Sequence, residues 1–465
     1  MHRGRILATV TAAQVLSVAS ATVVAVALPS LARDLGADGA QQQWVVDAFV
    51  LVFASLLVAG GVLGDRYGRR TALLAGLAVF ALGSAWCLVA PSVGWLLAGR
   101  VVMAFGPPLV LPASLAIVST TFTDPGARAR AVGIWGAGSG LGLTLGPLLG
   151  GAVVEVLGWR WVFGVNVPLC ALLALAAVRN VPRDRPVAAE HPFDGLAAGL
   201  LTAAVALLVF GLIEGRELGW GSAPVLGAFA AAALLTAVFV RHERRHPAPL
   251  VDLALLGHRP FLAANLGGAT FYGAVTGLAV YLSVFFQQVQ GRSALEAGLC
   301  LLPQGACTAL FAPVAGRLTA RLGPRPPIVA GMAIGTVVIL ALLQLEPATP
   351  IGDVWWAFAL LGAGIGIALP PMTVTAVSAT SADRAGMASA IHNASRQLGQ
   401  TFGVAVLGTI VLAGAGDAAR HHPLTGAAAD AWVEGLHAAL LVAAGALAVA
   451  GVVVAVLVRG AGRPA

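Results

Sequence analysis

The feature that most constrains this chain is a succession of long apolar stretches. Each holds about 20 residues, the length an α-helix needs to cross about 30 Å of hydrocarbon. We count fourteen such windows along the 465 residues. They cover residues 7–30, 45–63, 72–91, 95–118, 132–154, 161–178, 196–213, 223–240, 262–286, 297–315, 328–345, 354–377, 389–413 and 435–458. The sequence therefore predicts an all-α integral membrane protein with fourteen transmembrane helices.

The composition excludes the other common classes. The chain is 58% hydrophobic and 10% charged, whereas an ordinary soluble domain is about 45–50% apolar and about 25% charged. A membrane β-barrel alternates apolar and polar residues over about 10 positions. Runs such as AALLVAAGALAVAGVVVAVLV do not alternate. We therefore expect helices in a bilayer, with no nucleic-acid partner.

The arginines predict the orientation in the membrane. All 27 basic residues are arginine. With a cytoplasmic N-terminus, the alternation of windows places 20 of them in cytoplasmic segments and five outside, and leaves Arg100 and Arg396 within helices. Such an excess follows the positive-inside rule and predicts that both termini are cytoplasmic. The absence of lysine also excludes the phosphate-binding loop of an ATP-driven pump.

A short internal repeat predicts two related halves. GVLGDRYGRR at 61–70 and GRLTARLGPR at 316–325 match at four positions, with a constant offset of 255. Repeated bundles with a substrate site between them are the usual architecture of secondary transporters. We predict six-helix bundles at 1–180 and 261–465, and two additional central helices with cytoplasmic linkers at 181–260.

Several motifs together resemble one family. GGVLGDRYGRRTAL resembles the loop signature between the second and third helices of the major facilitator superfamily. LLAGRVVMAFGPPLVLPASLAIV, GLTLGPLLGGAVVE, WRWVFGVNVP and ASAIHNASRQLGQTFGVAVLGT follow in order and are similar to motifs of its fourteen-helix drug:proton antiporter branch. The resemblance covers most of the chain. It implies the major facilitator fold and export in exchange for protons.

The hinge GDRYGRR is the candidate gating motif. Its residues are Gly61, Asp65, Arg66, Gly68, Arg69 and Arg70. Glycines permit a tight turn and close helix contact. A carboxylate here can pair with guanidinium groups or with the N-terminus of another helix, and such pairs break when the halves move. The alternative is that the charges only orient the hairpin, but Asp65 adds little to topology.

GLTLGPLLGG is the candidate antiporter motif, formed by Gly142, Gly146, Pro147, Gly150 and Gly151. The first, second and fourth of these recur every fourth residue and give a smooth groove on one helix face. Pro147 removes a backbone hydrogen bond and permits a kink. Simple close packing of helices remains an equal alternative to a bending element.

Arg100 and Asp47 are the candidates for proton coupling. An ionisable residue at bilayer depth costs several kcal/mol and marks function. The resemblance implies that Arg100 influences proton transfer, and its fixed charge favours the ionised form of a nearby carboxylate. The first window has no acid, because Ser20 stands where the family often carries Asp. Asp47 is then either the proton carrier or an acid favoured by a helix N-terminus. Glu155 and Asp194 lie near helix ends, where we expect them to be solvated.

Aromatic and polar side chains mark a possible substrate cavity that suits bulky amphipathic compounds. They are Trp135, Tyr272, Tyr281, Phe285, Phe286, Gln287, His392, Asn393 and Arg396. Each single aromatic could instead pack against lipid or a neighbouring helix. A histidine side chain in water titrates near neutral pH, so we rank His392 second as a proton carrier.

The predicted function is proton-coupled efflux of hydrophobic or amphipathic drugs across the bacterial cytoplasmic membrane. We expect no metal and no cofactor, only a proton gradient, and a monomer whose partners are substrate, protons and lipid. One alternative is an exporter of a single natural product or metabolite. Another is a membrane-embedded enzyme, for which the nearest cluster, Arg420, His421 and His422 with Asp417, falls in a predicted external loop.

Overall fold

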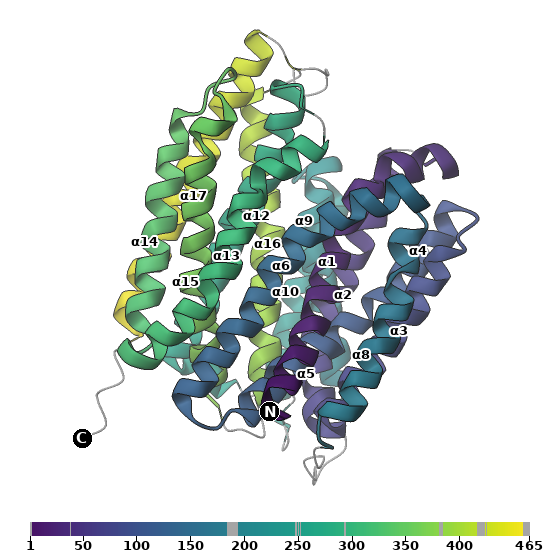
Figure 1. The fold of residues 1–465 in the computed structure, drawn as a ribbon, viewed down its shortest axis with the longest axis vertical. Helices are drawn as coiled ribbons and strands as arrows, with labels where there is room; N and C mark the ends of the chain where they lie inside the picture. Colours follow the sequence, from purple (N-terminus) through teal and green to yellow (C-terminus); the bar gives the residue numbers. More distant parts are fainter. Residues whose placement is uncertain are drawn as a thin grey trace.

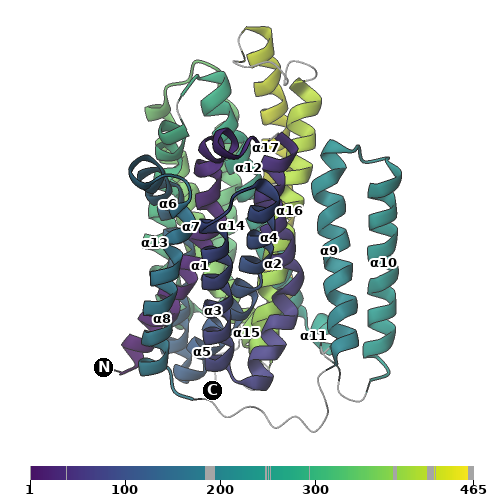
Figure 2. The ribbon, with the colours of Figure 1, turned by 90° about the vertical axis from the view of Figure 1, so that its right-hand side faces the viewer.

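The computed structural model describes residues 2–37, 39–183, 194–246, 249, 251, 253–292, 294–380, 385–415, 424 and 426–458. Within these ranges every regular element is helical and none is a strand. The elements pack as two bundles that lie side by side (Figure 1), with a separate pair of helices at the edge (Figure 2).

In the described residues the first bundle contains eight helical segments. They are α1 (His2–Leu35), α2 (Gly39–Tyr67), α3 (Arg69–Leu88), α4 (Val93–Ala104), α5 (Gly106–Thr121), α6 (Pro125–Leu157), α7 (Trp161–Gly164) and α8 (Asn166–Asn180). α7 with α8 makes one span. α4 and α5 form one span that is interrupted at Phe105, where Pro107 and Pro108 lack the amide hydrogens of a regular helix. Ser92 and Asp124 cap the starts of α4 and α6 by accepting hydrogen bonds from backbone amides.

The pair at the edge consists of α9 (Gly195–Glu217) and α10 (Ala223–Glu243). α9 packs against α2 and α16 (Ala385–Ala415), whereas α10 packs on α9 (Figure 2). A short helix, α11 (Ala254–Gly257), precedes the second bundle.

The second bundle repeats the pattern of the first. Besides α16 it contains α12 (Arg259–Val284), the π-helical segment η1 (Phe285–Val289), α13 (Ala294–Leu322), α14 (Arg325–Ala341), the 3₁₀ turns η2 (Leu342–Gln344) and η3 (Ile351–Asp353), α15 (Trp355–Val377) and α17 (Ala427–Leu457). Each bundle has its own apolar core. One core is centred on residues such as Leu73 and Phe163, and the other on Phe271 and Phe358.

Twelve spans in the described residues are long and apolar enough to cross a membrane. α6 and α16 are not among them. The predicted windows 132–154 and 389–413 fall on these two helices, so the count of fourteen stays a prediction.

The two copies of the internal repeat lie at the same end of the molecule. α2 and α13 each end at a glycine with positive φ, Gly68 at 97° and Gly323 at 78°, a conformation that favours glycine. These turns lie at the end where α1 begins (Figure 1). We call this end the motif end.

Candidate functional site

Asp65 joins the two bundles at the motif end. Its Oδ1 accepts hydrogen bonds from the backbone amide of Gly386 at 3.1 Å and from Arg69 Nη2 at 3.0 Å, and its Oδ2 accepts from the amide of Met387 at 2.9 Å. Gly386 and Met387 lie in the first turn of α16, where amides have no partner within the helix. The carboxylate therefore caps a helix of the opposite bundle, where the helix dipole favours negative charge.

Close helix packing holds this carboxylate in place. A Cβ on Gly61, one turn before Asp65, would lie 2.3 Å from the Ala390 Cβ and 2.7 Å from the carbonyl oxygen of Gly386. The Asp65 and Arg69 side chains are 12% and 10% exposed. The small residue thus lets α2 and α16 approach closely enough for Asp65 to reach the α16 amides.

The other arginines of the motif lie at the edge of this contact. Arg70 donates a hydrogen bond of 2.9 Å to the carbonyl of Val178 in α8. The guanidinium of Arg66 lies 5.8 Å from the ring centroid of Tyr67. Arg69 contacts Asp65 directly, through both Nε and Nη2.

The second repeat copy packs in the same way but lacks the acid. A Cβ on Gly316 of α13 would lie 2.6 Å from the carbonyl oxygen of Ala129 in α6, so this copy also contacts the opposite bundle. At the offset of 255, Asp65 corresponds to Ala320, which lies beside Gly126 at the start of α6. There the cap is Asp124 of the same helix, whose Oδ2 accepts from the Ala127 amide at 2.6 Å.

Arg100 is fully buried between α4 and α2. Its Nε donates a hydrogen bond of 2.8 Å to the Val45 carbonyl, and its guanidinium lies 4.3 Å from the centroid of the Phe49 ring. Its two terminal nitrogens have no hydrogen-bond partner in the described part of the chain. Asp47 is half-buried on α2 between Val45 and Phe49 in sequence. Residues two apart on a helix lie about 200° from one another, so Asp47 is on the face of α2 away from Val45 and Phe49, and the roles of both candidates stay predictions.

Ser20 belongs to a buried polar chain. Its hydroxyl donates to Asn166 Oδ1 at 3.4 Å, and Asn166 donates to the Ser84 hydroxyl at 3.3 Å. The position where the family often has an acid thus carries a neutral hydrogen bond that links α1, α8 and α3.

The glycine groove of α6 receives α1. Added Cβ atoms would lie 2.8 Å from the Val18 Cβ at Gly142, 2.1 Å from Thr22 Oγ1 at Gly146 and 2.5 Å from Val23 Cγ2 at Gly150. Gly151 is open by comparison, because its nearest neighbour is a Val26 methyl at 3.9 Å. The side chain of Pro147 lies outside the described residues. The groove is a close-packing surface within the first bundle, and a bending role remains a prediction.

His392 and Arg396 form a polar cluster in the second bundle. The His392 ring is fully buried, with Nε2 at 3.2 Å from Thr373 Oγ1 and Nδ1 at 3.3 Å from Asn265 Oδ1. One turn on, the Arg396 guanidinium lies 4.0 Å from the Tyr272 ring centroid and donates to the Tyr272 hydroxyl. The structure therefore brings together residues from α12, α15 and α16.

The remaining cavity candidates lie in separate places. Phe285 and Phe286 are fully buried and pack edge-on against each other, and Phe286 packs against Phe358, inside the second core. Their position is that of core residues. Trp135 is buried on α6 and donates a hydrogen bond of 3.0 Å to the Ser114 hydroxyl.

Three further candidates form hydrogen bonds, one with a neighbouring helix and two with residues four positions earlier in the chain. Tyr281 is buried and donates to the Val404 carbonyl at 3.2 Å. Gln287 donates to the Ser283 hydroxyl at 3.0 Å, and Asn393 donates to the Ser389 carbonyl at 2.9 Å. A shared substrate cavity for all these residues stays a prediction.

Two cavities open at the sides of the second bundle and of the edge pair. One, of about 630 Å³, lies between α9, α12, α16 and α17 and has Phe261 and Phe402 in its wall. The other, of about 920 Å³, lies between α9 and α10, with Arg241, Arg244 and Arg245 in its wall. None of the predicted cavity residues lines either of them.

Sequence reasoning missed one cluster at the motif end of the edge pair. The side chain of Asp194 is 7% exposed, so the expectation of a solvated helix-end acid is wrong. Its carboxylate caps α9 through the Ala197 amide at 2.9 Å and contacts His242 and His246. The sequence does show that the two histidines are four residues apart, which indicates that they share one helix face.

Comparison with known proteins shows the family. Residues 10–404 match the sequence model of the Major Facilitator Superfamily. The chain is 38% identical to the multidrug resistance protein Stp of Mycobacterium tuberculosis (strain CDC 1551 / Oshkosh), over 84% of this chain and 73% of that protein. It is 35% identical to the puromycin resistance protein pur8 of Streptomyces alboniger, over 97% of this chain and 90% of that protein. It is 34% identical to the tetracenomycin C resistance and export protein of Streptomyces glaucescens, over 85% of this chain and 73% of that protein.

Solved structures share the fold at low sequence identity. The human organic anion transporter MFSD10 (TETRAN) aligns with a TM-score of 0.68 and 18% identity, over 97% of this chain and 99% of that one. The proton:xylose symporter XylE aligns with a TM-score of 0.65 and 15% identity, over 95% and 94%. With its many apolar helices, this chain is a multi-pass membrane protein. It belongs to the major facilitator superfamily and is a transporter rather than an enzyme.

Proposed function

We propose that this chain exports hydrophobic or amphipathic drugs of the antibiotic class in exchange for protons. The observation that carries the proposal is the bond from Asp65 to the start of α16, because it joins the two bundles through contacts that must break when the motif end opens. The resistance and export relatives support the class of substrate.

The proposed topology has fourteen spans, with both termini in the bacterial cytoplasm. α6 and α16 pack against other helices, α6 against α1 and α13, and α16 against α12 and α2. A helix enclosed in this way can carry polar residues such as His392 across a bilayer, because they face protein rather than lipid. The arginine excess supports a cytoplasmic position for the motif end.

In this topology the structure is a state closed to the cytoplasm. Gly61 approaches α16, and Gly133 of α6 approaches Ala312 of α13, where an added Cβ would lie 2.6 Å from the Ala312 carbonyl oxygen. Both contacts lie in the motif-end halves of their helices. Export requires release of Asp65 from Gly386 and Met387, so that drug can enter from the cytoplasmic side.

Asp47 is the proposed proton carrier, and Arg100 the group that controls its charge. Asp47 lies on α2 two residues from Val45, whose carbonyl Arg100 bonds, and the Arg100 guanidinium nitrogens without a hydrogen-bond partner in the described residues can respond to a charge that moves near them. One charge that crosses the membrane yields about 2.3 kcal/mol per 100 mV. No cofactor is needed, and a monomer in lipid suffices.

The Tyr272, His392 and Arg396 cluster is the proposed polar anchor of the substrate site. A cavity with aromatic walls and few polar groups suits bulky amphipathic compounds. Arg396 Nε has no hydrogen-bond partner in the described residues, so a donor remains for the substrate.

Drug susceptibility tests the substrate class. The chain is expressed in a bacterium that lacks its main pumps, and growth is measured with puromycin, tetracenomycin C and unrelated amphipathic dyes. Protection against several of these compounds supports the proposal, together with drug efflux from loaded cells that depends on the proton gradient, as an uncoupler shows, and not on ATP. Full sensitivity to all of them at normal expression contradicts it.

A narrow exporter of one natural product is the second candidate, favoured because two relatives are named for single antibiotics. Protection against one compound alone would select it. Proton exchange has its own test in everted vesicles, where the drug should release protons. An Asp47→Asn variant that keeps the full signal would exclude Asp47 as the carrier.

A further inference from the structure

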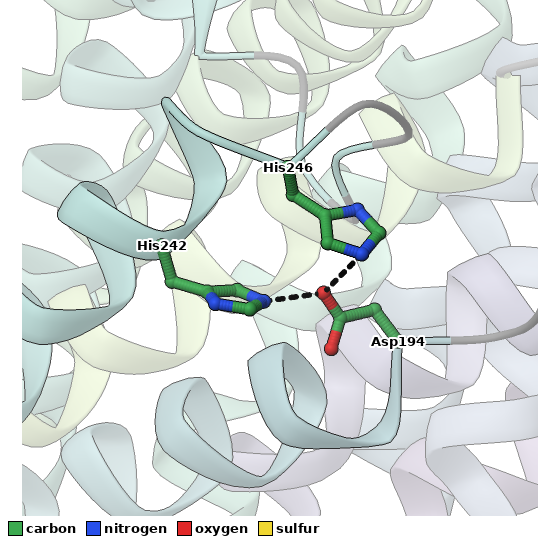
Figure 3. A group of neighbouring side chains, drawn as sticks. All are labelled: Asp194, His242 and His246. Carbon is green, nitrogen blue, oxygen red and sulfur yellow. Dashed lines mark hydrogen bonds and ion pairs between the residues drawn. The ribbon is translucent and has the colours of Figure 1, made fainter.

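Three metal-ligating side chains converge at the motif end of the edge pair (Figure 3). His242 Nε2 lies 2.6 Å from Asp194 Oδ2, and His246 Nε2 lies 3.6 Å from the same oxygen. The three potential ligand atoms all lie within 4.8 Å of one another. Both histidine rings point toward the carboxylate (Figure 3).

The fold supplies these ligands from two helix ends. Asp194 is the N-cap of α9, and its Oδ1 is held by the Ala197 amide, which leaves Oδ2 toward the histidines. His242 lies in the last turn of α10. His246 follows four residues later, in a turn whose amide donates to the His242 carbonyl at 3.0 Å. Residues four apart lie on one helix face, so both rings reach the same point.

Ligand type and spacing fit a first-row transition metal. Imidazole and carboxylate bind Zn²⁺ at about 2.0–2.2 Å, which puts tetrahedral ligand atoms about 3.3 Å apart. The two distances from Asp194 Oδ2 to the histidine nitrogens, 2.6 and 3.6 Å, bracket this value, and all three ligand atoms lie within 4.8 Å of one another. Asp194 is 7% exposed and the histidines 27% and 28%, so a fourth position can be filled by water.

Three neighbouring arginines disfavour the binding of any cation, but their side chains are not part of the site. Arg241, Arg244 and Arg245 belong to the same helix end and line the cavity between α9 and α10. They lower the affinity for a dication by repulsion, and they are not ligands. A soft or borderline metal that gains from two imidazoles is favoured over Mg²⁺ or Ca²⁺, which prefer oxygen ligands.

We propose that Asp194, His242 and His246 bind one divalent transition-metal ion of the zinc class, and that this ion clips the open ends of α9 and α10 together. The opposite ends are already joined by the connecting turn and by Trp220, which stacks on Phe229 at 6.5 Å and donates to Thr409 at 3.2 Å. The motif end has no such connection along the chain. The ion thus fixes the spacing of α9 and α10 at the end where both continue into the bundles.

Metal titration of the full chain tests the site. The protein is purified in nanodiscs through a tag without histidine and treated with a chelator. Co²⁺ is then added, because its visible absorption reports four-coordinate binding, and Zn²⁺ is used to displace it. We expect one Co²⁺ per chain, displaced by Zn²⁺, and a Zn²⁺-dependent rise in Tm.

Matched variants separate this site from other histidines. His242→Gln, His246→Gln and Asp194→Asn should each weaken Co²⁺ binding at least about tenfold, and Asn still caps a helix, so Asp194→Asn should fold. His258→Gln, on an exposed residue before α12, and the pair His421→Gln and His422→Gln, outside the described residues, should leave binding unchanged.

Three results would overturn the proposal. They are the absence of saturable Co²⁺ binding, binding that the three ligand variants leave intact, and a Tm that Zn²⁺ does not change while the ligand variants lower it equally with and without metal. The last would mean that Asp194 only hydrogen-bonds the histidines.

Discussion

Asp65 on α2 accepts a hydrogen bond of 2.9 Å from the backbone amide of Met387 on α16, 322 residues further along the chain. The bond crosses from the first bundle to the second. A charged acceptor on a helix N-terminus is favourable but depends on alignment. It can therefore hold the motif end closed in one state and be lost in another.

Loss of the Asp65 charge should weaken the closed state. Hydrogen bonds to charged groups contribute about 1.5–3 kcal/mol, and coupling of about 1–3 kcal/mol shifts an equilibrium about 5- to 150-fold. Asp65→Asn should therefore insert normally but transport at least about fivefold more slowly, measured as drug efflux from loaded cells. Asp353→Asn, on an exposed turn, is the control and should transport normally.

Bulk at Gly61 should separate α2 from α16. The added methyl of Gly61→Ala meets Ala390 at 2.3 Å and a backbone oxygen at 2.7 Å, and overpacking costs about 1–3 kcal/mol. We expect cysteine labels to reach the motif end more readily, with slower efflux. Gly64→Ala is the matched control, because its nearest neighbour would be the Ala72 Cβ at 3.5 Å. Equal effects of the two substitutions would mean that helix flexibility, not contact, matters.

The second repeat copy offers a test of charge placement. Ala320→Asp puts a carboxylate beside the start of α6, where Asp124 already caps the helix. Two like charges repel, so this variant should weaken closure and slow efflux several-fold. Asp124→Asn combined with Ala320→Asp should recover most of the efflux, because the new acid then caps α6 as Asp65 caps α16. If the double variant is slower than the single one, this geometric equivalence is wrong.

A pH-dependent contact lies at the opposite end. Hydrogen bonds from Trp159 and Arg160 hold the pKa of Asp34 below its ordinary value. The stabilisation is therefore present above the unfolded pKa of about 3.9 and is lost as the pH falls through the lower folded value. The difference in Tm between wild type and Asp34→Asn should be largest near pH 7 and shrink below about pH 4. A difference that grows as the pH falls would contradict this assignment.

Much of the fold could be predicted from local sequence. Apolar windows of about 20 residues suffice to predict helices, and the paired glycines Gly68 and Gly323 predict the equivalent turns. The partners of Asp65 could not be predicted, because Gly386 and Met387 reach it only through the packing of separate bundles. Phe285 and Phe286 were predicted at a cavity but lie in the core, since an aromatic next to polar residues gives the same sequence pattern in either place.

The cluster of Asp194 and His242 shows a second limit. Each residue taken alone is an ordinary polar group near a helix end. Only the antiparallel contact of α9 and α10 brings them within 2.6 Å. The spacing of His242 and His246 indicated a shared face, but the sequence does not show that Asp194 lies opposite it.

Spin-label distances test most directly whether the contact of Asp65 with α16 holds the motif end closed. The four cysteines Cys87, Cys170, Cys300 and Cys307 are replaced. Labels are then placed at the exposed Tyr67 and Leu322, one on each bundle at the motif end, or at Val156 and Trp355 at the opposite end. Asp65→Asn should shift the motif-end pair to longer distances and the opposite pair to shorter ones. Identical distance distributions in the wild type and Asp65→Asn, for both pairs, would contradict the claim that the Asp65 contact controls opening of the motif end.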